Sequence, residues 1–169
     1  PLGATWTIEE QKPDRLVLLG TLEHGLRLRR VFAVDSTGLH TESIVENVGS
    51  APQPAALEVS AEFDAGGVDA AAIDYGRERG QAIRKPLIAA GEEPTGKQSL
   101  SGADLPVRRW TLHRGDGGNV AVEFSTPQIA RVDQTWTAKS HPGAHFTLWS
   151  RDETLAPGAS LRVEAHYGR

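Results

Sequence analysis

Apolar and polar residues alternate along most of this chain. In residues 26–34 the even-numbered positions are apolar apart from Arg30, and the odd-numbered positions are mostly polar or small. Alternation with a period of two is typical of a half-buried β-strand. Ten segments show such runs, and we predict strands at residues 5–10, 15–22, 26–34, 39–47, 55–63, 107–113, 119–125, 129–137, 145–150 and 160–167.

The breaks between these segments are rich in turn-forming residues. Asp-Ser-Thr-Gly at 35–38, Gly-Asp-Gly-Gly at 115–118 and Ala-Pro-Gly at 156–158 each contain glycine or proline, which favour tight changes of direction. About ten short strands with few helical periods predict an all-β fold, and specifically an antiparallel β-sandwich.

The middle of the chain is less regular. Residues 65–104 are rich in Ala, Gly, Pro and charge without a clear period, which predicts a loop-rich insertion. The alternative is one or two edge strands within it, for instance around 82–88. A length of 169 residues favours a single domain over 1–169, with the later part of a larger sandwich as the alternative.

Composition excludes several partners and sites. The net charge of −4 argues against nucleic acid, because phosphate binding needs a basic face. No apolar run approaches the ~18 residues that a spanning helix requires, so no membrane partner is expected. The absence of cysteine excludes disulfides and thiolate metal sites, and it leaves the cellular compartment open.

A first group of candidate site residues lies in residues 57–64. Alternation puts the apolar residues of this segment on one face and Glu58, Ser60, Glu62 and Asp64 on the other. Such a row of acids can bind sugar hydroxyls or calcium, or perform acid–base chemistry. The alternative is a row that simply faces solvent.

A second group lies in residues 130–150. Arg131 falls on the polar face of one predicted strand, and His145 and Trp149 share one face of the next. A flat indole can pack against a pyranose while charged groups pair with its hydroxyls, so these residues predict a carbohydrate site. The alternative for Trp149 is a half-buried core residue at the edge of a sheet.

His141 and His145 have a spacing of four, which suits a metal site on a helix. Pro142 and Gly143 lie between them, so a helix is not expected there. We therefore predict no metal or other cofactor, with calcium on the acidic row left as an alternative. His141 remains a candidate sugar contact.

Two stretches resemble the galactose mutarotase-like, or aldose 1-epimerase-like, β-sandwich family. Near the start, a Gly-Leu-x-Leu-x-Arg strand at 25–30 is followed by Gly-Leu at 38–39, Asn-x-Gly at 47–49 and a Pro before an apolar strand. Near the end, the segment HFTLWSRDETLAPGASLRVEAHY is similar to the family's closing strands and its Leu-x-Pro-Gly turn. The resemblance implies a carbohydrate-related sandwich, and full members of the family are longer than this chain.

The residues that the family uses for catalysis are missing at the matching positions. The resemblance implies a general-acid His where this chain has Ser60, and a general-base Glu within residues 147–150, which read Thr-Leu-Trp-Ser. Opening an aldose ring requires one group to accept a proton and another to donate one. The chain therefore does not look like an active mutarotase.

Three hypotheses of function remain. The first is a non-catalytic carbohydrate-binding or accessory domain of a carbohydrate-active protein, in contact with other domains of that protein. It uses the residues Glu62, Arg131, His141, His145 and Trp149. The second is a structural sandwich that packs against another domain or protein through an exposed sheet face. The third is an epimerase or lyase-like enzyme in which a His and Glu62 have taken over the catalytic roles.

Overall fold

The computed structural model describes residues 4–67, 70–77, 82–86, 95–137 and 143–169. Nearly all of these residues lie in strands or tight turns, and three single 3-10 turns are the helical elements described. None of the described helices is long or apolar enough to cross a membrane. The elements are β1 (Thr5–Lys12), β2 (Arg15–Thr21), η1 (Glu23–Gly25), β3 (Leu26–Asp35), β4 (Gly38–Asn47), β5 (Gln53–Ala55), β6 (Glu58–Asp64), β7 (Ala72–Arg77), β8 (Ile83–Pro86), β9 (Thr95–Ser101), η2 (Gly102–Asp104), β10 (Pro106–His113), β11 (Asn119–Phe124), η3 (Thr126–Gln128), β12 (Ile129–Thr137), β13 (Gly143–Ser150), β14 (Glu153–Leu155) and β15 (Ser160–Gly168).

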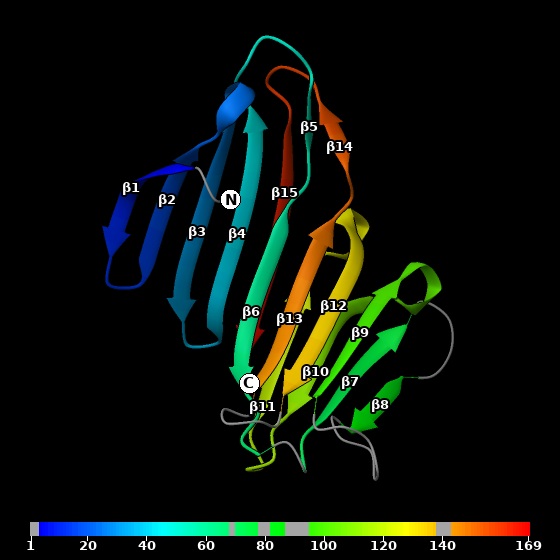
Figure 1. The fold of residues 1–169 in the computed structure, drawn as a ribbon. Coiled ribbons are helices and arrows are strands. Elements are labelled where there is room, and N and C mark those ends of the chain that lie inside the picture. The colour runs from blue at the N-terminus through cyan, green and yellow to red at the C-terminus, as the bar shows by residue number, and fades with distance from the viewer. Residues whose placement is uncertain (1–3, 68–69, 78–81, 87–94, 138–142) are drawn as a thin grey trace.

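The strands form two large antiparallel sheets that pack face to face (Figure 1). The nine-stranded sheet has the order β1-β2-β3-β4-β15-β11-β10-β7-β8, and the four-stranded sheet has the order β6-β13-β12-β9. A small sheet joins β14 to β5. The prediction of an antiparallel all-β sandwich is therefore confirmed.

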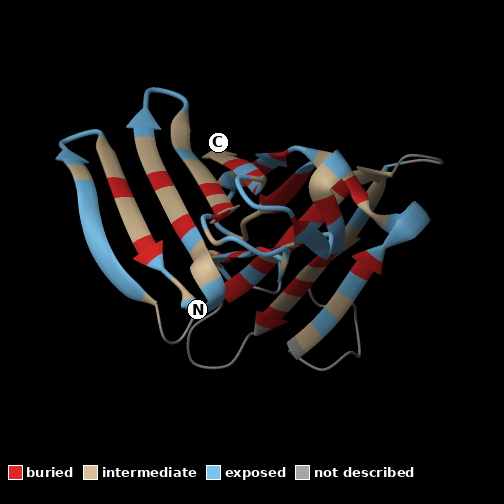
Figure 2. Cartoon of the chain, turned by 90° about the horizontal axis from the view of Figure 1, so that it is seen from above, coloured by how far each residue is buried: buried red, intermediate tan, exposed pale blue. Residues whose placement is uncertain are grey.

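The nine-stranded sheet is wider than its partner. In Figures 1 and 2, strands β1 to β3 extend beyond the edge of the four-stranded sheet as a wing. Burial follows this geometry, because β1 is exposed along nearly its whole length. The buried core lies where the two large sheets overlap.

The prediction of a loop-rich insertion at residues 65–104 needs correction. This stretch contains β7, β8 and β9 in addition to its loops. Alternation does not reveal β7, because its first two residues, Ala72 and Ile73, are both buried. In β9, the sequence TGKQSLS is polar or small on both faces up to the buried Leu100. The edge strand offered as an alternative around 82–88 corresponds to β8.

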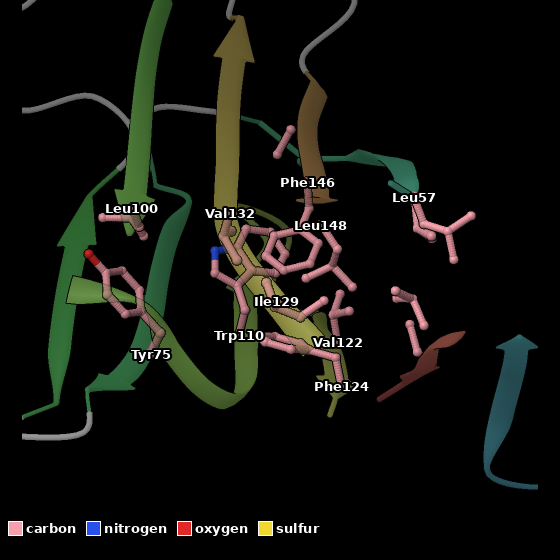
Figure 3. Packing of buried hydrophobic residues seen from close by; sticks show 14 of the residues in the cluster. Leu57, Tyr75, Leu100, Trp110, Val122, Phe124, Ile129, Val132, Phe146 and Leu148 are labelled. Carbon is pink, nitrogen blue, oxygen red and sulfur yellow. The ribbon is translucent and has the colours of Figure 1, made fainter. Parts of the chain in front are cut away.

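Aromatic side chains fill the centre of the core (Figure 3). Trp110 on the nine-stranded sheet and Phe146 on the four-stranded sheet are both completely buried, and their ring centroids lie 4.8 Å apart. Phe124 on the neighbouring strand β11 also packs against Phe146, with the ring centroids 5.8 Å apart. Such large, closely packed rings contribute much of the apolar area that holds two sheets together.

A buried hydrogen-bonded chain crosses the same core. The indole Nε1–H of Trp110 donates to Gln134 Oε1 at 2.8 Å, and Gln134 Nε2 donates to Gln98 Oε1 at 2.7 Å. Gln134 is only 2% exposed, so water cannot replace these partners. The chain joins β10 of one sheet to β12 and β9 of the other and fixes how they lie against each other.

Asn47 explains the Asn-x-Gly motif in physical terms. Its side chain is fully buried and donates to the carbonyls of Ala51 and Leu155, both at 2.8 Å. Its Oδ1 accepts the N–H of Gly49 at 3.0 Å. The motif therefore closes the end of β4 and ties it to β14.

Replacing Gln134 by Leu should destabilise the fold. The substitution leaves the Trp110 N–H buried without an acceptor, which costs about 1–3 kcal/mol of unfolding free energy. Urea unfolding of Gln134→Leu, Trp110→Phe and the double variant measures this cost and the coupling between the two residues. The role of the Trp110–Gln134 hydrogen bond would be contradicted by either of two results. One is a double variant whose loss of unfolding free energy equals the sum of the two single losses, and the other is a Gln134→Leu protein as stable as its parent.

Candidate functional site

The outer face of the four-stranded sheet carries a continuous patch of polar side chains. Antiparallel pairing lines up residues of one face in rows across the four strands, such as Glu62, His145, Thr135 and Lys97. We call this patch the polar face. It consists of Glu58, Ser60 and Glu62 of β6, His145, Thr147 and Trp149 of β13, Arg131, Asp133 and Thr135 of β12, and Lys97, Ser99 and Ser101 of β9.

Four of the five residues that the sequence analysis selected lie on this face: Glu62, Arg131, His145 and Trp149. The fifth, His141, lies outside the described residues. The spatial grouping follows from the alternation within each strand together with the strand order β6-β13-β12. The binding role of these residues stays a prediction.

Asp133 organises one end of the polar face. Its carboxylate accepts the indole N–H of Trp149 at 2.9 Å and the hydroxyl of Ser99, and Arg131 Nε lies 3.3 Å from Oδ1. The side chain of Asp133 is only 16% exposed, whereas that of Arg131 is 44% exposed. The carboxylate is therefore a positioning group that holds an aromatic and a cationic side chain at the surface.

Trp149 is consequently fixed in orientation. The guanidinium of Arg131 lies over its ring, 4.4 Å from the centroid, in a cation–π arrangement. Trp149 is half-buried, so part of the indole reaches solvent. Sequence reasoning selected both residues and missed the role of Asp133, although the same alternation places Asp133 two positions after Arg131.

The middle of the polar face holds hydroxyl groups where the family resemblance implies catalytic groups. Ser60 of β6 pairs directly with Thr147 of β13, and their hydroxyl oxygens lie 3.1 Å apart. The Ser60 hydroxyl is also within hydrogen-bond distance of Glu58, to which it can donate at 3.2 Å. Two aliphatic hydroxyls are poor proton-transfer groups at neutral pH, so this pair offers no acid–base chemistry.

The far end of the face carries the pair of His145 and Glu62. Their side chains are 46% and 69% exposed, and Nε2 lies 3.4 Å from Oε1. An exposed pair of this kind contributes little to stability. The two groups contact each other, whereas an acid and a base that act on a sugar would lie on either side of it, roughly 5–8 Å apart by proton-transfer reach.

A cleft of about 1440 Å³ lies on the outer face of the other, nine-stranded sheet. Its floor includes His40 and Glu42 of β4 and Arg162, Glu164 and His166 of β15. Arg162 forms ion pairs with both glutamates, and the two histidine rings stack with centroids 4.2 Å apart. Sequence reasoning missed this floor, although the alternation in β4 and β15 already separates its residues from the buried ones.

The turn between β3 and β4 borders the floor of the cleft. Asp35, where this turn begins, has the most strongly shifted pKa among the carboxyl groups described. The hydroxyl and the backbone N–H of Thr37 donate to Asp35, and with the neighbouring His40 they lower the pKa of Asp35 to about 2. The Thr37 oxygen also lies 3.3 Å from the Nε2 atoms of both His40 and His166. The turn is thus tied to both histidines by one hydroxyl.

Comparison with known proteins identifies the fold. No protein-family model and no curated protein sequence matches the chain. Among solved structures, a proposed aldose 1-epimerase of Escherichia coli K12 aligns with a TM-score of 0.76 and 14% identity, over 96% of this chain and 67% of that one. A galactose mutarotase-like protein of Lactobacillus casei ATCC 334 aligns with a TM-score of 0.72 and 13% identity, over 96% and 72%.

A third neighbour is far larger. The GH36 α-galactosidase AgaA of Geobacillus stearothermophilus aligns with a TM-score of 0.55 and 17% identity, over 97% of this chain and 27% of that one. The chain therefore has the galactose mutarotase-like fold, as its motifs suggested. It spans about two thirds of the length of the first neighbour. At these identities the likeness establishes the fold alone.

Removing the carboxylate of Asp133 should release Trp149. In Asp133→Ala the indole N–H loses its acceptor, so its exchange with solvent should accelerate and the unfolding free energy should fall by about 1–3 kcal/mol. Hydrogen exchange of the indole cross-peaks in ¹⁵N-edited spectra checks this. Asp133→Asn keeps one acceptor oxygen and should show a smaller change, and unaltered exchange in the Ala variant would refute the positioning role.

Proposed function

We propose that this chain is a non-catalytic carbohydrate-binding domain whose ligand lies across the polar face. The observation that carries the proposal is the indole of Trp149, held in place by Asp133 and Arg131, with His145 and Glu62 at the other end of the same face. Indole rings bind the apolar faces of pyranoses, and charged side chains form strong hydrogen bonds to hydroxyl groups. The fold itself occurs in carbohydrate-related proteins.

The chemistry of the face supports binding without turnover. Ser60 and Thr147 stand at the centre of the face, and neither can act as an acid or base near neutral pH. The remaining candidates, His145 and Glu62, are paired with each other. An open, exposed face with a single fixed aromatic ring gives few desolvated contacts, so the affinity should be weak, roughly micromolar to millimolar.

No metal enters this proposal. Among the residues that the structure describes, no three His, Asp or Glu side chains converge as a metal site would require. In this proposal the acidic residues of β6 accept hydrogen bonds from sugar hydroxyls.

A second candidate function is an interdomain or interprotein contact through the wing. The core-side face of β1 to β3 extends past the four-stranded sheet and carries Trp6, Ile8 and Val34, which are 39%, 62% and 57% exposed. Exposed apolar residues that gather on one face favour an interaction surface. This contact is compatible with sugar binding, because it uses a different sheet.

Neutral sugars should change the fluorescence of Trp149. We expect a saturable shift on titration with one or more neutral mono- and oligosaccharides, galactose included, and its loss in Trp149→Leu. Trp6→Phe on the wing is the matched control and should retain the shift. The proposal fails if the folded protein responds to no neutral sugar, or if the response survives in Trp149→Leu.

Polarimetry tests the absence of catalysis. The protein should not accelerate the interconversion of the anomers of any sugar that it binds, because the paired hydroxyls at the centre of the face cannot transfer the required protons. Acceleration above the rate in buffer would favour the enzyme hypothesis instead.

A further inference from the structure

One end of the cleft on the nine-stranded sheet is built around the η3 turn. The backbone N–H of Arg108 donates to Thr126 Oγ1 at 3.0 Å, and the backbone N–H of Arg151 donates to the carbonyl of Gln128 at 2.9 Å. Both arginines are exposed, and both line the cleft. Two segments far apart in the sequence are thus anchored to the same turn, and each contributes an arginine to the lining of the cleft.

The backbone at Arg108 is unusual. It adopts a φ of +65°, in the left-handed region that residues other than glycine rarely occupy. It lies in the irregular part of β10, where the pairing with β7 shifts between Pro106 and Trp110. Irregularities of this kind redirect side chains, and strained residues are retained where the surrounding structure holds them in place.

The charges along the cleft are unevenly distributed. Arg162 is paired with Glu42 and Glu164, and Arg109 is paired with Glu123 at 3.4 Å. By contrast, within the described ranges neither Arg108 nor Arg151 has an ion pair. The floor of the cleft, with two arginines against three glutamates, therefore carries a slight excess of negative charge, and the η3 end carries excess positive charge.

We infer that this cleft binds an acidic oligosaccharide, with a uronate carboxylate held by Arg108 and Arg151. Arginine binds carboxylates through paired hydrogen bonds, which suits a single anionic group at one end of a ligand. The paired acids and the two histidines of the floor offer acceptors and donors to hydroxyl groups. The same acids, Glu42, Glu123 and Glu164, would repel a polyanion that carried charge along its whole length.

The size of the cleft also favours an oligosaccharide. Sites for single small molecules usually measure about 300–1,000 Å³, whereas this cleft measures about 1440 Å³. This inference rests on the proposed function as a saccharide-binding domain and adds a second site, on the opposite sheet, for an acidic ligand.

Calorimetric titration with an aldotriouronic acid, a neutral disaccharide that ends in a single glucuronate, and with its methyl ester tests the inference. The parent protein should bind the acid at least tenfold more tightly than the ester. Raising the salt concentration should weaken the binding of the acid and leave the binding of the ester unchanged. Arg108→Gly and Arg151→Gln should each reduce acid binding by about tenfold or more. Glycine accepts the positive φ at position 108, so the first variant should melt no lower than the parent.

Arg84→Gln on β8 is the matched control, because it removes the same charge from outside this cleft, and it should bind the acid as the parent does. Equal binding of acid and ester, or parent-like binding by the two cleft variants, would overturn the inference.

The same titrations also distinguish the site in the cleft from the site on the polar face. Trp149→Leu should lose the neutral-sugar response and keep binding of the aldotriouronic acid. A protein that binds neutral sugars through Trp149 but does not bind the aldotriouronic acid refutes only the cleft site, and the reverse outcome refutes only the polar-face proposal.

Discussion

The buried contact between Trp110 and the opposing sheet is the interaction on which the rest of this structure depends. The indole packs on Phe146 and donates its only hydrogen bond to Gln134, so it fixes both the distance and the sideways position of the two sheets. A ring this large cannot move without opening a cavity, and its N–H cannot turn elsewhere without losing its buried partner. The overlap of the two sheets follows from this one contact.

The residues that each sheet buries in the core also decide which residues lie on its outer face. Successive side chains of a strand point to opposite sides, so each buried residue leaves its neighbours outside. In β12, Val132 and Gln134 lie in the core, and Arg131 and Asp133 are therefore on the polar face. In β15, Val163 and Ala165 lie in the core, and Glu164 and His166 therefore reach the cleft. Both proposed sites are consequences of the same packing.

Alternation within single strands predicted much of this arrangement. It identified the all-β sandwich, and it put Glu62, His145 and Trp149 on polar faces that the strand order then joins. It failed in residues 65–104, because β7 begins with adjacent buried residues and β9 is polar on both sides until Leu100. The cleft was not predictable either. It depends on strands that are distant in sequence, on the η3 turn and on the positive φ of Arg108, and none of these leaves a periodic signal.

The central claim is that sugar is bound at the outer face of the four-stranded sheet, and the four tryptophans of the chain report on it directly. Trp149 lies on that face, Trp110 and Trp136 are buried, and Trp6 lies on the wing. The first measurement is therefore the set of indole ¹⁵N–¹H signals during titration with the neutral saccharide panel. The account predicts that the Trp149 signal moves and saturates while the Trp110 and Trp6 signals stay in place. Movement of the Trp6 signal alone, or of none of the four, would contradict it.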